Sequence, residues 1–427
     1  MLEIQKRLSN GFYAMISLPA TAMGFALSVQ ISALSWLLST KYGLDIHEIG
    51  IVWAAGPLAG IFGQVIIGLL SDRVWFWGGR RRPFILIGGS LAALMLFLLP
   101  RIDAVNDALG LENILMVAIG VALTLDLSIN ISFNPTRSII ADVTPEGTPR
   151  TKGYTWMQTI SGFWGVMAYV IGAAFGNATL ITAGVVIVLV FSILPTFFVT
   201  EPRHLADAKQ PGAGTTGGRT AWGQLGRMYL AHGFSWIGVQ TMFVYIIAFI
   251  QQKLIAPSAT VADAGQEAGQ IIAITFAVLN SVGFILPALV LEPVAERIGR
   301  VRTHTLCVAL MAAGYFGIAA FASTSGILYA LMAVVGIGWG AVVSLPFAIM
   351  SESVDRTRMG LFMGVFNLSV VIPQLVVSLA LGIVIHNAPD KGIIFLMSGG
   401  ALAISALLWL FVREPGRTGP AATHAGH

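Results

Sequence analysis

Long apolar stretches separated by short polar segments dominate the chain. A helix that crosses a bilayer needs about 20 mostly apolar residues, and twelve stretches satisfy this requirement. They are residues 12–40, 47–71, 83–100, 112–141, 153–176, 179–200, 221–250, 267–291, 303–322, 326–350, 359–385 and 392–412. The pattern predicts an all-α integral membrane protein with twelve transmembrane helices.

The two halves of the chain repeat each other. The same Glu-Pro pair ends the sixth stretch at Glu201 and the twelfth stretch at Glu414. The longest polar segment, residues 201–220, divides the stretches six and six. We therefore expect an N-terminal six-helix bundle over residues 1–200, a cytoplasmic linker, and a C-terminal bundle with a short tail over residues 221–427. Two pseudo-symmetric parallel repeats imply a central cavity near the membrane midplane.

Composition supports the membrane prediction, because 56% of residues are hydrophobic, 10% are charged and the mean hydropathy is +0.82. Soluble proteins average about 25% charged residues. Of the 24 lysines and arginines, 19 fall at the chain ends, on the even-numbered loops or beside them, and four fall on the odd-numbered loops. This asymmetry predicts that both termini are cytoplasmic, and it explains the net charge of +4 without a nucleic-acid partner.

Cysteine and histidine give no sign of a metal centre. The single cysteine, Cys307, excludes an internal disulfide and a cysteine-based cluster. The seven histidines form no ligand pattern, and His204 and His232 are expected near the central linker. We expect a multi-pass protein of the inner (plasma) membrane that is monomeric, contacts the lipid bilayer and has no cofactor.

One polar stripe interrupts the fourth apolar stretch. At 100° per residue, Asp126, Asn130 and Arg137 lie on one helix face, with Phe133 on the same stripe and Asn134 beside it. A charge at the bilayer centre costs about 2.5–3.5 kcal/mol on insertion scales. The stripe should therefore face a bundle interior or a water-filled cavity. Alternatively, Arg137 snorkels to the interface and Asp126 is neutralised by protonation.

An acidic-Arg loop with a following Gly-Arg pair comes after the second stretch and again after the eighth. This repeated motif resembles the signature of the major facilitator superfamily, which implies a charge latch that joins helix ends in one conformational state. Alternatively, its arginines only fix the topology. The expected latch residues are Asp72, Arg73, Arg80, Arg81, Arg137, Glu296 and Arg297.

Further motifs resemble one branch of that superfamily. The second stretch carries Trp53, Gly56 and Gln64, the fourth carries Leu125-Asp126, and the eleventh carries a Val-Ile-Pro-Gln run that ends at Gln374. Together these motifs resemble the sucrose-transporter branch of the glycoside–pentoside–hexuronide symporters. Together with the polar stripe, the resemblance implies a sugar site built from Gln30, Gln64, Asp126, Asn130, Phe133, Asn134, Asn367, Gln374 and Ser378. The plant members of the family carry Gln-Gly where this chain has Phe133-Asn134, so the residues that contact the sugar are expected to differ there.

The chemistry of these residues suits a sugar. A disaccharide needs hydrogen-bonding groups that converge among apolar walls, and Asn367 and Gln374 lie two helical turns apart on one face. Phe133, Trp156 and Trp164 are candidate ring faces for the sugar. A lone amide in a spanning helix can instead be interhelical glue worth about 1 kcal/mol.

The expected function is proton-coupled import of a disaccharide or glucoside, such as sucrose or maltose, by alternating access. Asp126 is the expected proton site, because a buried carboxyl group can take up and release a proton and can accept sugar hydroxyls. The chain contains no Walker A motif and no nucleophile elbow, so we expect neither ATP use nor an enzyme. The alternatives are a Na⁺-coupled sugar symporter, an exporter of drugs or metabolites, and a non-transporting membrane sensor.

Overall fold

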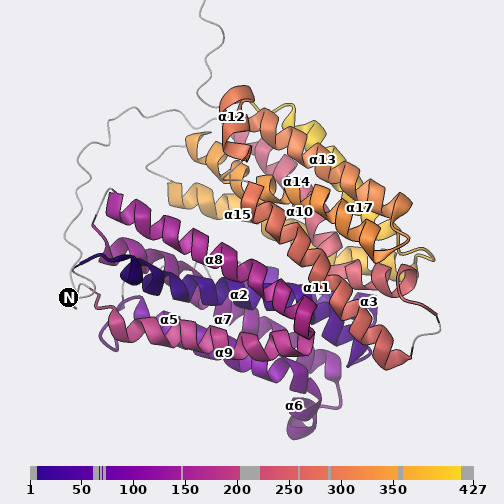
Figure 1. Ribbon diagram of the computed structural model, residues 1–427, viewed down its shortest axis with the longest axis horizontal. Helices are drawn as coiled ribbons and strands as arrows, with labels where there is room; N and C mark the ends of the chain where they lie inside the picture. The colour runs from indigo at the N-terminus through magenta and orange to yellow at the C-terminus, as the bar shows by residue number, and fades with distance from the viewer. Residues whose placement is uncertain are drawn as a thin grey trace, which may run out of the picture.

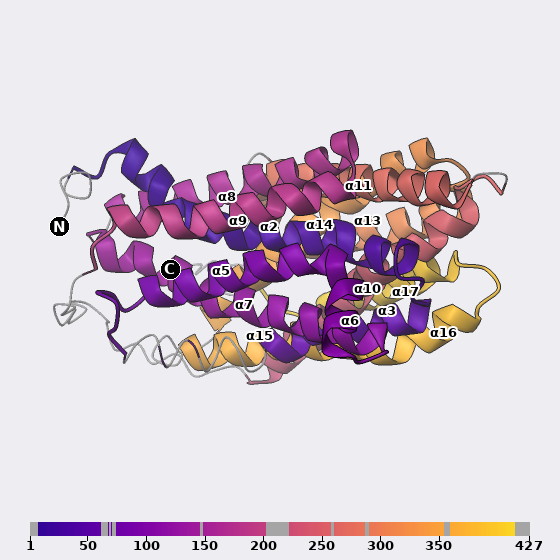
Figure 2. The ribbon, with the colours of Figure 1, turned by 90° about the horizontal axis from the view of Figure 1, so that it is seen from below.

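The protein, in a computed structural model, is a bundle of long helices (Figure 1). The structure describes residues 7–60, 67, 70, 74–145, 148–201, 222–257, 260–286, 290–353 and 359–414. Figure 2 shows that most helices run along the longest axis of the molecule. This arrangement is the one expected of a protein whose helices cross a bilayer.

The helices follow the predicted order. The N-terminal half contains α2 (Asn10–Thr40), α3 (Ile46–Trp53), α5 (Arg82–Leu98), the 3₁₀ turn η1 (Leu99–Arg101), α6 (Ile102–Leu109), α7 (Ile114–Val143), α8 (Thr148–Phe175) and α9 (Asn177–Phe198). The C-terminal half contains α10 (Trp222–Lys253), α11 (Val261–Leu286), α12 (Glu292–Ile298), α13 (Arg300–Phe321), α14 (Ser325–Ser353), α15 (Met359–Val376), the π-helical turn η4 (Val377–Leu381), α16 (Gly382–Asn387) and α17 (Ile393–Trp409).

Ten helices among the described residues are long and apolar enough to cross a membrane. Each corresponds to one of the twelve predicted stretches. The twelfth stretch forms α17, which has 17 residues. Of the second stretch, α3 and residues 55–60 are helical, and most of residues 61–71 lie outside the described part of the chain. The all-α membrane fold is thus confirmed, with ten of the predicted crossings seen among the described residues, two of them (82–109 and 365–387) built from consecutive helical segments.

Local sequence signals start several of these helices. Ser9 accepts a hydrogen bond from the backbone N–H of the third residue of α2, and Asn113 does the same for α7. Asp45 and Glu48 form a capping box at the start of α3. Such caps satisfy backbone donors that have no partner within the helix. They fix where the spanning segments begin.

Two helical groups form the molecule (Figure 1). In the N-terminal half, α2 packs on α8 and α9, and α5 packs on α7 and α9. In the C-terminal half, α10 packs on α17 and α15, and α13 packs on α14 and α17. The halves meet chiefly along α8 and α11, with further contacts of α3 with η4 and α16.

Several of the hydrogen bonds described between the halves lie near one end of the molecule. This end, here called the α3 end, holds α3, α6 and α16 (Figure 2). The opposite end, which holds α12 (Figure 1), is called the α12 end. Trp36 Nε1 donates to the carbonyl of Gly265 at 2.6 Å, and Gln251 Nε2 donates to Ser39 Oγ at 3.0 Å. These four residues join α2 to α10 and α11 near the ends of those helices.

Candidate functional site

A buried carboxyl group lies near the middle of α7. Asp126 is the thirteenth residue of this 30-residue helix, about 18 Å from its start at 1.5 Å per residue. Its side chain is buried, with 6% of the residue surface exposed. Gln30 Nε2, from α2, donates a hydrogen bond of 3.0 Å to Asp126 Oδ2. The two predicted site residues therefore meet in the interior of the N-terminal half.

Gly56 borders the Asp126 carboxylate on a second side. A Cβ atom built on Gly56 would lie 3.2 Å from Asp126 Oδ2, which is closer than ordinary van der Waals contact. A Cβ atom built on the neighbouring Gly60 would have no other atom within 4 Å. Absence of a side chain at position 56 thus lets the second predicted stretch approach the carboxylate closely.

The remaining residues of the polar stripe have separate partners. Asn130 Nδ2 donates to the carbonyl of Asp126 at 2.8 Å, which is a bond within α7. The Arg137 guanidinium lies 4.2 Å from the centre of the Phe133 ring. Phe133 and Asn134 are half-buried, whereas Arg137 is exposed. Arg137 therefore contacts an aromatic ring, and no ion pair between it and Asp126 is found among the described residues.

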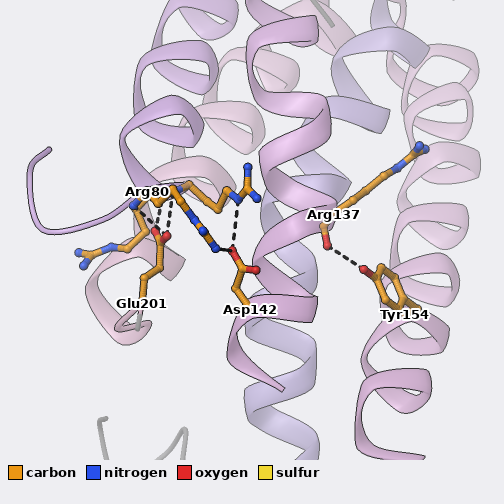
Figure 3. A network of polar contacts seen from close by, with 7 residues as sticks. Arg80, Arg137, Asp142, Tyr154 and Glu201 are labelled. Atoms are coloured by element: carbon orange, nitrogen blue, oxygen red, sulfur yellow. Dashed lines mark hydrogen bonds and ion pairs between the residues drawn. The ribbon is translucent and has the colours of Figure 1, made fainter. Parts of the chain in front are cut away.

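Arg137 also lies apart from the charged cluster at the α12 end of α7. Figure 3 shows its guanidinium on the opposite side of the helix from Asp142. Its carbonyl accepts a hydrogen bond of 3.2 Å from the Tyr154 hydroxyl of α8. Arg137 was predicted to belong to the same latch as Arg80 and Arg81. No direct contact described between Arg137 and these two residues supports that prediction.

The C-terminal half contributes a second group of amides. Gln374 Nε2 of α15 donates to Gln240 Oε1 of α10 at 3.3 Å. Asn367, two turns earlier in α15, is half-buried. Ser378 lies in η4 with its hydroxyl buried and without a hydrogen-bond partner among the described residues. An Oγ with no partner is free to bond a ligand or water once either reaches it.

An aromatic group beside these amides was not singled out by the sequence. Trp236 packs edge-to-face on Trp339, which packs in turn on Phe243, and Phe243 packs on Phe276. Trp339 Nε1 donates to Asn280 Oδ1 at 3.2 Å. Both tryptophans are half-buried, so part of each side chain remains accessible. The only available signal was the spacing of Trp236, Gln240 and Phe243 along one face of α10.

The aromatic candidates of the N-terminal half have packing partners. Trp164 lies edge-to-face against Phe25, Phe163 and Phe191. Trp156 is half-buried and packs against the core around Tyr13. These contacts favour structural roles for both tryptophans.

Glu201 closes a charged cluster at the α12 end of the N-terminal half (Figure 3). Its two carboxylate oxygens accept the backbone N–H groups of Arg80, Arg81 and Arg82 at 2.9, 2.8 and 2.7 Å. The side chains of Arg80 and Arg81 bond Asp142 Oδ2 at 2.8 and 3.2 Å. The cluster ties the ends of α5, α7 and α9 together, and hydrogen bonds to charged groups are the stronger kind.

The C-terminal half repeats this arrangement. Glu414 accepts the backbone N–H groups of Arg300 and Val301 at 3.1 and 2.8 Å, at the start of α13. Arg300 Nε adds a contact of 3.4 Å to the same carboxylate. Glu201 and Glu414 were visible in the sequence as a repeated Glu-Pro pair. Their role as partners of the arginine loops was missed, because the sequence does not show which acid meets which loop.

Several predicted residues cannot be placed. Gln64, Asp72 and Arg73 lie outside the described residues, as does the side chain of Glu296. Arg297 is described and exposed on α12.

The structure corrects the expected position of His232. This residue lies inside α10 and is fully buried, because it stacks on Phe366 with ring centres 4.7 Å apart. Its Nε2 accepts a hydrogen bond of 3.0 Å from Trp236 Nε1. The sequence position of His232, shortly after the linker, suggested a place near the linker. The residue is instead buried because α10 begins at Trp222 and His232 lies about three turns inside it.

A layer of contacts, one of which joins the two halves, lies between Asp126 and the α3 end. Trp53 Nε1 donates to Ser35 Oγ at 2.8 Å, and Ser35 Oγ donates to the carbonyl of Val244 at 3.0 Å. Ser35 follows Gln30 by five residues, which places it about 7.5 Å further toward the α3 end. The Tyr245 hydroxyl donates to the carbonyl of Val377 in η4 at 3.1 Å.

Comparison with known families identifies the class of this protein. The family model described as Major Facilitator Superfamily matches residues 16–378, with a second match over 241–427. The chain belongs to this superfamily and is a membrane transporter, not an enzyme.

Individual relatives are more distant. The chain is 23% identical over 437 residues to the sucrose transport protein SUC4 of Arabidopsis thaliana, covering 88% of this chain and 85% of the relative. It is 29% identical over 231 residues to the general alpha-glucoside permease of Schizosaccharomyces pombe, covering 48% and 41%. Its fold is similar to that of the nucleoside transporter NupG, with a TM-score of 0.71 at 13% identity over 94% of this chain and 98% of that structure.

Proposed function

We propose that the protein imports a disaccharide or α-glucoside together with protons by alternating access. The contact between Gln30 and Asp126 carries this proposal. It places a carboxyl group, buried near mid-membrane, beside a hydrogen-bonding amide on a second helix. Such a carboxyl group is costly to keep charged and is a candidate for proton binding.

Sugar is the substrate class that the relatives favour. The names of two relatives refer to sucrose transport and to an alpha-glucoside permease. The amides Gln30, Gln240 and Gln374 and the ring faces of Trp236 and Trp339 have the chemistry that a sugar site requires. The site then draws on both halves, as expected for repeats that enclose a central substrate.

Proton transfer and sugar binding would be linked at Asp126. The protonated carboxyl group is neutral and is the form that burial favours. After proton release, the carboxylate becomes an acceptor for two sugar hydroxyls or for Gln30 Nε2. Competition between Gln30 and the sugar for this carboxylate would tie occupancy of the sugar site to the proton.

The α12 end is the proposed cytoplasmic end. It holds the arginine loops, and positively charged loops remain in the cytoplasm. Contacts of Trp36 and Ser39 join the halves at the opposite, proposed outer end. Both termini would then lie in the cytoplasm of a plasma-membrane protein that acts as a monomer. The clusters at Glu201 and Glu414 would hold helix ends as the halves rock.

Proteoliposomes with an internal pH-sensitive dye test the coupling. Sucrose, maltose, trehalose, melibiose and glucose are added in turn to the purified wild-type protein under a sodium-free buffer. We expect internal acidification with at least one disaccharide and a smaller response to glucose. Radiolabelled uptake that requires Na⁺ and moves no protons would overturn the proton assignment. Failure of every sugar under both cations would overturn the substrate class.

A further inference from the structure

A pocket of about 630 Å³ lies between α12, α13 and α17, away from the proposed sugar site. Its walls include Leu306 and Leu410, which are 61% and 67% exposed, and its polar lining includes Arg302 and Glu414. It lies at the α12 end of the C-terminal half. A pocket with an apolar wall and a basic rim at the end of a spanning helix suits an amphiphile.

The pocket opens on the side of the molecule that faces lipid. α13 packs on α12, α14 and α17, and α17 packs on α10 and α13, all within the C-terminal half. Figure 1 shows α13 on the face of this half away from the N-terminal half. Arg302 is the third residue of α13, so it lies at the level where a spanning helix meets the headgroup region.

The charges of the pocket favour an anion. Glu414 is already bonded to the N–H groups of Arg300 and Val301 and to Arg300 Nε. Arg302 is exposed and forms no hydrogen bond or ion pair with the described residues. Arg413, next to Glu414, is also exposed. With Glu414 neutralised, the pocket presents a guanidinium that can bind a phosphate in bidentate fashion.

Trp409 supplies a second, independent observation. It lines the pocket, is fully buried, and its Nε1–H has no hydrogen-bond partner among the described residues. A buried donor without a partner is costly. Because Nε1 lies beneath the pocket surface, an oxygen of a bound headgroup would satisfy this donor only after the side chains that cover it shift.

We infer that this pocket binds an anionic phospholipid, with Arg302 paired to the headgroup phosphate and Leu306 and Leu410 against the acyl chains. The site stands apart from Asp126 and does not depend on the transported substrate. A basic residue near a membrane surface adds about 1 kcal/mol to anionic-lipid binding, which corresponds to about a fivefold change in affinity.

Native mass spectrometry of the purified full-length protein tests this site with phosphatidylglycerol and phosphatidylethanolamine as probes. Arg302→Gln removes the charge, and Thr305→Trp fills the pocket that Thr305 lines. Arg7→Gln is the matched control, because Arg7 is exposed before the start of α2 and outside the pocket. Size-exclusion profiles establish that each variant is folded, and Arg302→Gln carries the test where the bulkier variant aggregates.

We expect the wild type to retain one phosphatidylglycerol in preference to phosphatidylethanolamine. Arg302→Gln should weaken that binding by about fivefold, Thr305→Trp should abolish it, and Arg7→Gln should leave it within twofold. Equal retention of the two lipids by the wild type would overturn the proposal. So would equal losses in Arg302→Gln and Arg7→Gln, or displacement of the lipid by millimolar glycerol phosphate, which would indicate a site for the free anion.

Discussion

At the scale of single residues, the account depends on what surrounds Asp126. Its carboxylate has Gln30 on one side and the bare backbone of Gly56 on another. The chemistry of Asp126 and Gln30 could be predicted from the sequence, because polar groups within apolar stretches stand out. The role of Gly56 could not, since closeness to Asp126 depends on how two helices pack.

A side chain at position 56 should disturb this arrangement. A methyl group in Gly56→Ala would press on Asp126 Oδ2, and the branched side chain of Gly56→Val would displace the carboxylate from Gln30. We expect sugar uptake to fall by about tenfold in Gly56→Val, the equivalent of one lost hydrogen bond, and by less in Gly56→Ala. Initial rates of radiolabelled uptake, normalised to protein level, measure the effect.

Gly60→Ala is the control for this pair, because the added Cβ would meet open space one turn further along the same segment. Uptake by Gly60→Ala should match the wild type. Equal losses at both positions would show that helix flexibility, and not the space beside Asp126, explains the result.

At the scale of elements, apolar length predicted twelve spanning helices, and ten of them are seen among the described residues. The features that apolar length could not predict depend on contacts between elements that are far apart in the sequence. The π-helical turn η4 follows Pro373 in α15, and its Val377 carbonyl accepts the Tyr245 hydroxyl of α10. The bond between Glu201 and the start of α5 joins residues far apart in the sequence. Neither follows from a local pattern.

Removal of the Glu201 carboxylate should destabilise the N-terminal half. Glu201→Ala leaves three backbone N–H groups at the start of α5 without their acceptor. We expect the apparent melting temperature in detergent to drop by about 5 °C or more, because hydrogen bonds to charged groups contribute about 1.5–3 kcal/mol each. Differential scanning fluorimetry measures the shift.

Glu414→Ala should give a smaller drop, since Glu414 accepts two described backbone bonds. The matched control is Glu267→Ala, which removes an exposed carboxylate of α11. A melting temperature for Glu201→Ala equal to that of Glu267→Ala would refute the structural role of the cluster.

At the scale of the whole molecule, the sequence repeat predicted two halves but not where they touch. Contact at the α3 end depends on pairs such as Ser39 with Gln251, which come from different repeats. Transport by alternating access requires that such contacts break and re-form. In the proposed alternating-access cycle, the observed arrangement is one state, and the opposite end closes in another.

A covalent link across the α3 end should stop that cycle. Cysteines at Ser39 and Gln251, in a Cys307→Ser background, should form a disulfide that joins the halves and abolishes sugar uptake until a reductant is added. The control pair replaces Lys41 and Asp103, which form an ion pair of 3.1 Å within the N-terminal half. A disulfide there should leave uptake intact. Full uptake by the oxidised Ser39–Gln251 pair would contradict rocking of the two halves.

The central claim, that Asp126 couples protons to sugar, is tested most directly by comparing accumulation with exchange in Asp126→Asn. The amide keeps the shape of the side chain but cannot release a proton. Asp107→Asn, at an exposed position of α6, makes the same chemical change outside the site. We predict that Asp126→Asn loses sugar accumulation against a gradient yet still exchanges sugar across the membrane, while Asp107→Asn does both. Accumulation by Asp126→Asn at the wild-type level would contradict the account.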